Sequence, residues 1–248
     1  MVNMSRYADL YYSPNCKRDS GMHIVQIVPS ISIEASGPSQ SVRGLTRGLL
    51  EYNQTVSIAA MDIRDEGFVA KPLSPNEHVF PMASGPKKLG RSPKLYRWLS
   101  SLVTREPRVV LHNHGMWQLM CLYGAQLANR DNVILLQSPR NALSAYSLSS
   151  GSKFKPLFWR LFQAKALNRA HCFHATSEDE YHDIRAAGFS QPVAVIPNGV
   201  EIPELRVDSP KGTGRTLTYL GRVHPEKGLE NLFHAWYSVQ DDYPNWSC

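Results

Sequence analysis

The sequence predicts an α/β protein built on a doubly wound parallel sheet. Short apolar runs of strand length recur along the chain, and segments with apolar side chains at helical spacing separate them. Strands that alternate with helices in this way form parallel sheets, because each connection is long enough to cross over the sheet. A stretch rich in Pro and Gly, residues 201–214, precedes a further strand and helix, which predicts the start of a second unit of the same kind.

The expected strands are apolar runs bounded by polar or turn-forming residues. They comprise residues 22–29, 55–60, 109–114, 133–136, 172–175 and 193–196. Between them, apolar side chains at helical spacing predict a helix after residue 40 and helices over 93–103, 154–170 and 178–187. Gly188 follows the last of these and is typical of a helix C-terminus.

Two of these helices combine an apolar stripe with cations. The stripe of the first contains Leu95, Trp98, Leu99 and Leu102, and that of the second contains Phe154, Leu157, Phe158, Leu161 and Phe162. We expect both stripes to pack on the sheet, as in other α/β domains. A face that inserts into a membrane is the alternative for each of them.

These patterns divide the chain into four parts. Residues 1–21 show no apolar periodicity and are expected to form a disordered leader. Residues 22–200 are predicted to form an N-terminal Rossmann-like domain, residues 201–214 a linker, and residues 215–248 the first strand and helix of a second Rossmann-like domain. A parallel strand needs neighbours, so we expect the second domain to be incomplete within these 248 residues.

Composition and charge limit the classes of partner. No apolar run is long enough to cross a bilayer, residues 1–21 are too polar for a signal peptide, and the four cysteines are scattered, which favours a cytoplasmic protein. The net charge is +6, and the segment 84–108 alone carries seven Lys or Arg against one Glu. This cluster predicts an anionic partner, including a membrane surface at the inner face of the cytoplasmic membrane. No nucleic-acid-binding motif is present, so no nucleic-acid partner is expected.

The segment after residue 215 carries a candidate diphosphate site. An expected strand over residues 216–220 ends at Gly221, and Arg222, Lys227 and Gly228 precede a helix. Glycine lets backbone amides approach an anion, the helix N-terminus adds a positive dipole, and Arg and Lys supply charge. The alternative is that Arg222 and Lys227 are ordinary solvated cations near a helix start.

A second group of polar residues follows the buried strand over 109–114. Open α/β sheets bind ligands beyond the carboxyl ends of their strands, and His114 lies at that point. Its imidazole is able to hydrogen-bond a hydroxyl or to take up a proton. A histidine that caps the next helix is the alternative for His114, and a packed, hydrogen-bonded side chain is the alternative for His112.

Together these segments resemble the retaining glycosyltransferases of family 4, also called glycosyl transferases group 1, which have the two-domain GT-B fold. The resemblance extends from about residue 22 to residue 246. It rests on five motifs in this order: Ser36-Gly37-Pro38, His112-Asn113-His114-Gly115-Met116-Trp117, His174-Ala175-Thr176-Ser177-Glu178, Ile196-Pro197-Asn198-Gly199-Val200, and Gly221-Arg222 with Lys227-Gly228. Singly these motifs have little specificity, but their order and spacing are highly specific.

The resemblance implies a function and a set of site residues. It implies transfer of a sugar from a nucleotide-diphosphate sugar to a glycan or lipid-linked acceptor with retention, in polysaccharide or lipopolysaccharide biosynthesis, with no metal and no cofactor. Gly221, Arg222 and Lys227 would bind the donor diphosphate, and Ser36, Gly37 and His112 would belong to an acceptor or phosphate loop. The catalytic candidates are His114 and Arg140.

Two positions depart from the family pattern. Related sequences tend to have His where this chain has Arg140, and Gly where it has Asn141. Arg is able to bind a phosphate or a substrate carboxylate, but it does not act as a base at neutral pH. Ser36 stands where the family often has glycine, which restricts the approach of the backbone to a substrate.

Two other functions remain open. The family's paired-glutamate motif, which contacts the donor sugar, lies beyond residue 248, so the chain is alternatively an inactive, truncated remnant that binds an acceptor or an anion. A nucleotide-sugar epimerase with two Rossmann-like domains is the third hypothesis. The linker and the loop spacing disfavour it.

Overall fold

The computed structural model describes residues 21–32, 37–62, 72–86, 89–150, 152–200, 215–221, 223 and 227–248. The chain separates into two compact units, Met1–Glu201 and Ile202–Cys248. The expected leader and linker lie outside the described residues, except for Gly21, and so do Ser36 and Arg222. Within the part that is described, no helix is long and apolar enough to cross a membrane.

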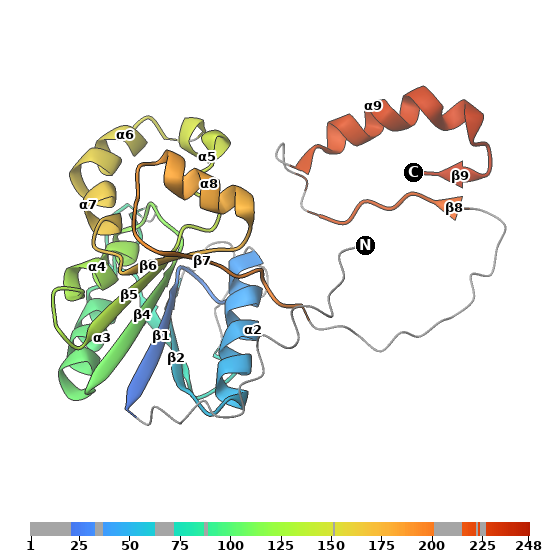
Figure 1. Cartoon of the computed structure of the whole chain (residues 1–248). Helices are drawn as coiled ribbons and strands as arrows, with labels where there is room; N and C mark the ends of the chain where they lie inside the picture. Colours follow the sequence, from blue (N-terminus) through green and yellow to red (C-terminus); the bar gives the residue numbers. More distant parts are fainter. Residues whose placement is uncertain are drawn as a thin grey trace. The chain divides into compact units, whose positions relative to one another are not determined.

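The first unit is built on a seven-stranded parallel sheet with strand order β3-β2-β1-β4-β5-β6-β7 (Figure 1). Its strands are β1 (Met22–Val28), β2 (Thr55–Asp62), β3 (Glu77–Pro81), β4 (Arg108–His114), β5 (Val133–Ser138), β6 (Cys172–Ala175) and β7 (Val193–Val195). Every adjacent pair is parallel. The predicted fold class is therefore confirmed, and β3, a half-buried edge strand, is the strand that the sequence patterns missed.

Helices cover both faces of this sheet. They are α2 (Gly37–Glu51), α3 (Pro93–Arg105), α4 (Tyr123–Leu127), α5 (Ala145–Ser149), α6 (Lys155–Phe158), α7 (Ala164–Leu167) and α8 (Glu178–Ala186). In Figure 1, α2 lies on one side of the central strands, and α3 and α4 lie on the other. Successive residues of a strand point to opposite faces, so Ile58 packs with Val42 of α2, whereas Ala59 packs in the larger cluster with α3.

Helix α3 packs as the sequence predicts. Its N-terminus is capped by Ser92, whose side chain accepts a hydrogen bond from the Leu95 amide, and proline occupies the first helical position. Leu95 and Leu99 are fully buried and Leu102 nearly so. The cations Arg91, Lys94, Arg97, Arg105 and Arg108 are all exposed, while Lys87 and Lys88 lie outside the described residues.

The helical segment from residue 155 to residue 167 differs from the prediction in two ways. A π-turn, η3 (Trp159–Gln163), separates α6 from α7. The predicted burial of the stripe was wrong: Phe154, Leu157, Leu161 and Phe162 are exposed, and only Phe158 is half-buried. The opposite side of the segment faces the core instead, because Gln163 and Leu167 are buried there.

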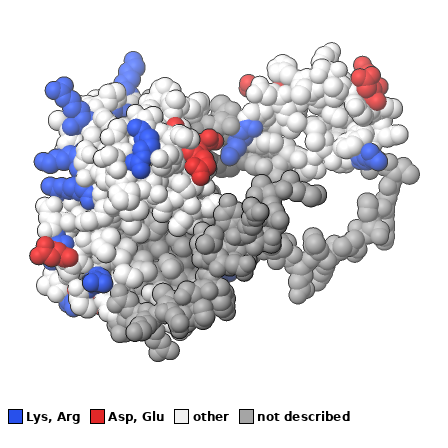
Figure 2. All heavy atoms as spheres, viewed as in Figure 1, with Lys and Arg blue, Asp and Glu red and all other residues white. Residues whose placement is uncertain are grey.

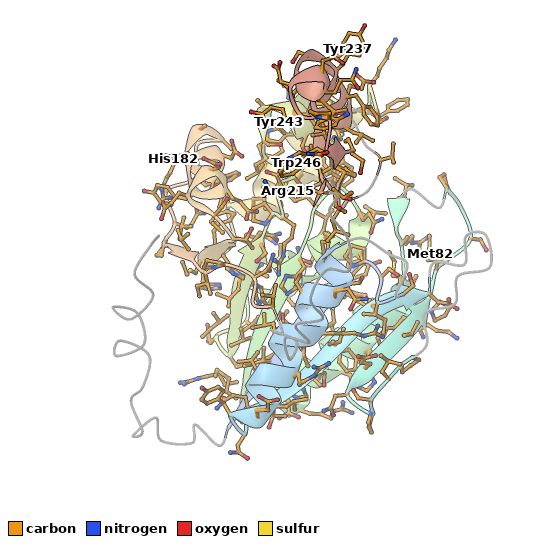
Figure 3. All side chains as sticks on the ribbon, turned by 90° about the vertical axis from the view of Figure 1, so that its right-hand side faces the viewer. Met82, His182, Arg215, Tyr237, Tyr243 and Trp246 are labelled. Carbon is orange, nitrogen blue, oxygen red and sulfur yellow. The ribbon has the colours of Figure 1, made fainter. Side chains whose placement is uncertain are left out.

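The described residues of the second unit form the helix α9 (Leu229–Val239), the short 3-10 helix η5 (Gln240–Asp242) and a small sheet. In that sheet β8 (Arg215–Thr216) pairs in parallel with β9 (Trp246–Ser247). Figure 3 shows Arg215 and Trp246 close together, and the guanidinium carbon of Arg215 lies 5.5 Å from the centre of the Trp246 ring. The expected strand over 216–220 was wrong beyond Thr216, since residues 217–220 are not in a strand. None of the described residues of this unit is buried.

Candidate functional site

The carboxyl ends of four adjacent strands carry a buried polar cluster on one face of the sheet. Gln26 of β1 is in register with His112 of β4, and His114 of β4 is in register with Ser138 of β5. His174 lies on the next strand, β6, one residue after Phe173, which is in register with Gln137 of β5. Gln26, His112, His114 and Ser138 are all at most 5% exposed. The alternation of side chains along the strands therefore gathers distant polar residues on the face that α2 partly covers.

Hydrogen bonds fix the protonation state of His114. The Arg140 guanidinium donates to His114 Nδ1 from Nε at 3.2 Å and from Nη2 at 2.9 Å, so Nδ1 carries no proton. His114 Nε2 then carries the proton and donates it to the Gln26 side-chain oxygen at 2.6 Å. Burial lowers the pKa of His114 well below its usual range, and His112 and Arg140 lower it further. His114 is neutral, and both of its ring nitrogens are engaged.

His112 and His174 form a second ordered chain. His174 Nε2 donates to the Ile196 carbonyl at 2.9 Å, which leaves His174 Nδ1 to accept from His112 Nε2 at 3.2 Å. His112 Nε2 also lies 3.0 Å from the Ser138 hydroxyl. Burial lowers the pKa of His112 strongly and that of His174 less, with neighbouring positive charge adding to both shifts. The ring centres of His112 and His114 are 4.0 Å apart, so a proton on one ring opposes protonation of the other.

Arg140 reaches this cluster from a left-handed turn after β5. Arg140 has φ 57° and Asn141 has φ 63°, a conformation that costs energy for residues other than glycine. The buried carboxylate of Glu180 on α8 holds the turn, because its Oε1 accepts from the Asn141 amide at 2.9 Å. Its Oε2 accepts from the amide and hydroxyl of Thr176 at 2.7 and 2.9 Å. Glu180 therefore links the turn to the end of β6.

The guanidinium of Arg140 also reaches the chain after β7. Its Nη1 donates to the Asn198 side-chain oxygen at 2.7 Å, which connects β5, β4 and the segment after β7 through one side chain. Burial lowers the pKa of Arg140, and the negative charge of Glu180 opposes that shift. Arginine nevertheless stays charged at neutral pH, so Arg140 is the cation among neutral imidazoles.

Two cavities meet at Arg140. One has a volume of about 340 Å³ and lies at the carboxyl ends of β1, β4 and β5, between the N-terminus of α2 and the loop after β4. Its polar lining includes Ser30, Ser39, His114 and Arg140. The other has a volume of about 660 Å³ and lies between α2 and residues 196–200, with Arg140, His174 and Asn198 in its wall. A ligand in either cavity would contact the same guanidinium.

The loop after β4 shapes the smaller cavity. Gly115 has φ 94°, a conformation that L side chains rarely adopt, and its amide donates to the Ser138 carbonyl at 2.8 Å. This bond ties the end of β4 to the end of β5, so His114 and Arg140 are held at one edge. The glycine in the His-Gly-Met-Trp motif is therefore required by the backbone.

The predicted site residues fall into three groups. His112, His114 and Arg140 come together in the polar cluster, whereas Gly37 lies at the N-terminus of α2 and lines a neighbouring cavity of about 600 Å³ with Arg43 and Arg47. Gly221 and Lys227 belong to the second unit and are exposed. Ser36 and Arg222 lie outside the described residues. No group of His, Cys, Asp and Glu side chains in the described ranges is arranged to hold a metal.

The sequence patterns did not identify Gln26 or Glu180 as site residues. Gln26 is a polar residue inside an otherwise apolar strand and is fully buried, which was the available signal. Glu180 follows the N-cap Ser177 at the N3 position, where glutamate usually supports the helix start. Only the tertiary structure shows that its carboxylate faces the turn at Arg140.

Removing the Glu180 carboxylate should destabilise the first unit. In Glu180→Ala the amides of Asn141 and Thr176 lose the buried carboxylate that accepts from both, so we expect a loss of about 2–4 kcal/mol of unfolding free energy. Urea denaturation of the full chain measures this. The exposed Glu178→Ala is the matched control and should cost less than about 1 kcal/mol. Equal effects of the two changes would contradict the role given to Glu180.

The neutral histidines should make stability depend on pH. The pKa values of His112, His114 and His174 are lower in the folded than in the unfolded chain, so the unfolded chain binds more protons below about pH 6.5. Stability is then complete above that pH and falls as the pH drops, by at most about 1.4 kcal/mol per pH unit for each histidine. Urea midpoints between pH 5 and pH 8 measure the slope.

A single-residue change should reduce that slope. His114→Asn removes one of the three groups, so its urea midpoint should fall less steeply below pH 6.5 than that of the unchanged chain. His182→Asn is the control, because His182 lies on the exposed side of α8 (Figure 3). A slope unaffected by His114→Asn would mean that His114 does not contribute to it.

Comparison with known proteins assigns this fold to a family. The model of the glycosyl transferase 4-like domain matches residues 36–199. HepE of Anabaena, solved with UDP and glucose, is 16% identical, with a TM-score of 0.57, over 90% of this chain and 59% of its own. MnaA of S. aureus, solved with UDP, is 16% identical, with a TM-score of 0.46, over 91% of this chain and 61% of its own.

A candidate UDP-N-acetylglucosamine 2-epimerase of Listeria monocytogenes is 10% identical, with a TM-score of 0.48, over 91% of this chain and 60% of its own. No curated protein sequence matches significantly. The chain spans about three-fifths of the length of these solved structures. At 16% identity, the likeness to HepE shows the fold alone. The family match covers well over half of the 248 residues and includes His112, His114, Arg140 and Asn198, so the chain belongs to the glycosyl transferase 4-like domain family.

Proposed function

We propose that the protein is a glycosyltransferase that moves a sugar from a nucleotide-diphosphate sugar to a glycan or lipid-linked acceptor. The observation that carries the proposal is the convergence of His114, Arg140 and Asn198 beside the two cavities that meet at Arg140, within the region of the family match. The structural likeness to HepE, which was solved with UDP and glucose, supports a nucleotide sugar as donor. Retention of configuration, a role in polysaccharide or lipopolysaccharide biosynthesis and a cytoplasmic location are parts of the same proposal.

The geometry gives His114 an orienting role. Its Nδ1 accepts from Arg140 and its Nε2 donates to Gln26, so no free lone pair is available to deprotonate an acceptor hydroxyl. His114 instead fixes the plane of the Arg140 guanidinium at the wall of the cavity. The proposed transfer then uses no protein nucleophile and no metal, and the leaving phosphate of the donor takes up the proton of the acceptor.

Arg140 is suited to bind an anionic group of the substrate. A guanidinium has five N–H bonds. Nε and Nη2 each donate one N–H to His114, and Nη1 donates one to Asn198. Two N–H bonds of the guanidinium are left without a partner among the described residues. No carboxylate of the described chain forms an ion pair with it. A half-buried cation with free donors beside a cavity favours a phosphate or a carboxylate, and Arg binds both through two parallel hydrogen bonds.

The second unit contributes the proposed donor contacts. Lys227 and Gly228 precede α9, and Gly228 has φ 62°, which a glycine at a helix start adopts readily. A helix N-terminus and a cation suit a diphosphate. Lys227 is exposed and none of the described side chains around it is buried, so no described residue of this unit holds Lys227 in one position. A binding group that is not held in place contributes little affinity.

Anion binding at Arg140 is testable by NMR of the histidine rings in the full chain. Glucuronate or glucose 1-phosphate should shift the His114 resonances, whereas glucose should not. Arg140→Gln should weaken this binding by at least about tenfold, the effect of losing one charge-assisted hydrogen-bonded contact. Arg97→Gln, an exposed change on α3, is the control. If the shifts persist in Arg140→Gln, the anion binds elsewhere.

Donor binding separates an active enzyme from an inactive remnant. Because Lys227 is exposed and no described residue holds it, we expect calorimetric titration of these 248 residues with uridine and guanosine diphosphate sugars to show no tight binding, and turnover to be negligible. The same chain should still bind an acceptor or an anion at Arg140. Robust transfer by these 248 residues, unaffected by Arg222→Ala with Lys227→Ala, would show that the donor site is misplaced.

A further inference from the structure

The helical segment formed by α6, η3 and α7 has two apolar faces, whereas an ordinary surface helix has one. Its inner face is anchored in the first unit: Trp159 stacks near Trp117 and Phe189, with ring centres 6.0 Å apart in both pairs, and Leu167 is buried. Phe158 lies between the two faces, 6.5 Å from the ring of Trp117. The inner face alone therefore attaches this segment to the core, and the side chains of the outer face are not needed for that packing.

The outer face carries large apolar side chains that no described residue of the first unit covers. Phe154 is 76% exposed, Leu157 55%, Leu161 54% and Phe162 48%. The first three recur at intervals of three and four residues, and Phe162 follows Leu161 directly. Tyr146 and Leu148 of the neighbouring helix α5 are 46% and 43% exposed. We call these six residues the apolar ridge. A contiguous exposed patch of this kind marks an interaction surface.

The chain segment that carries the apolar ridge has charges of one sign. Residues 142–177 contain five Lys or Arg and no Asp or Glu. Lys153, Arg160 and Lys165 are exposed, whereas Lys155 is turned toward the Trp117 ring and donates to the carbonyls of Ser147 and Ser150. Figure 2 shows blue side chains projecting from the edge of the molecule where α6 and α7 lie, with no red among them.

We propose that this surface docks on an anionic lipid bilayer, with the apolar ridge inserted among the headgroups and acyl chains and the surrounding cations on the lipid phosphates. Large apolar side chains flanked by Lys and Arg on one helical face are the features that bind the interface of a membrane. The absence of acidic side chains from residues 142–177 suits a negatively charged bilayer and disfavours a second copy of this basic surface, which would repel it.

The exposed cations of α3 form a different kind of surface. The apolar stripe of α3 is buried, so Lys94, Arg97 and Arg105 offer charge without apolar side chains to insert. Charge alone gives weak, salt-sensitive adhesion. The proposal thus places the main membrane contact at the apolar ridge and not at the segment 84–108.

The test is co-sedimentation of the full chain with vesicles of phosphatidylcholine, with and without phosphatidylglycerol. Binding should require the anionic lipid and fall with added salt. Replacing Phe154, Leu157 and Leu161 together by Gln should weaken binding by at least about tenfold, since the variant removes three large apolar side chains from the inserted surface. Because these side chains are exposed, the variant should unfold at the same urea concentration as the unchanged chain.

Two matched variants make the outcome decisive. Lys153→Gln, Arg160→Gln and Lys165→Gln together should weaken binding and its salt dependence, whereas Lys94→Gln, Arg97→Gln and Arg105→Gln should change it by no more than about twofold. Binding that is lost only in the α3 variant would overturn the proposal, and so would equal binding to neutral vesicles. Light scattering without lipid measures the oligomeric state of the chain and of its variants. A dimer that the apolar variant converts to a monomer would identify a protein interface instead.

This proposal stands apart from sugar transfer. The vesicle measurement needs no nucleotide sugar and no acceptor, so membrane binding without transfer leaves the docking proposal intact. Transfer without membrane binding would leave only the proposed function.

Discussion

The hydrogen bonds of the Arg140 guanidinium are the interaction on which the rest of the site depends. One side chain contacts His114 at the end of β4 and Asn198 after β7, and it starts from a turn at the end of β5. That turn is left-handed at two consecutive residues, a conformation that persists only where the surroundings hold it. Glu180 provides the hold from α8 through the Asn141 amide. The strand ends are thus joined by one cation and one buried carboxylate.

The surroundings of Arg140 are polar but neutral. His112, His114 and His174 have lowered pKa values, because burial above all, and the positive charge of Arg140, oppose their protonation. Their hydrogen bonds give each ring a defined tautomer. The assignment starts from Arg140, which is able only to donate, and it extends through His114 to Gln26. The cluster is therefore preorganised around a fixed positive charge, which is the arrangement that stabilises an anion without reorganisation.

The same segment of chain links the site to the apolar ridge. After Ser138 the chain forms the turn at Arg140 and then enters α5 and α6, so about fifteen residues separate the guanidinium from Phe154. The inner face of α6–α7 packs on Trp117, which follows the His114 strand. An acceptor held at the bilayer surface by its lipid would therefore be presented close to the cavity. The two proposals are compatible in space within the first unit, although each rests on its own observations.

The sequence by itself determined six of the seven strands of the first unit, its longer helices, the parallel sheet and the position of His114 at a strand end. Local periodicity and glycine placement decide these features, and the motifs identified the family. The sequence did not reveal Glu180 as the partner of the turn, because the two are close only after β5 and β6 pair. It also favoured burial of the stripe at Phe154, since periodicity shows that a helix has an apolar face but not which way the face points. Trp159 and Leu167 face the core instead, because they pack against Trp117 and the sheet. Only the tertiary structure decides which side of the helical segment does so.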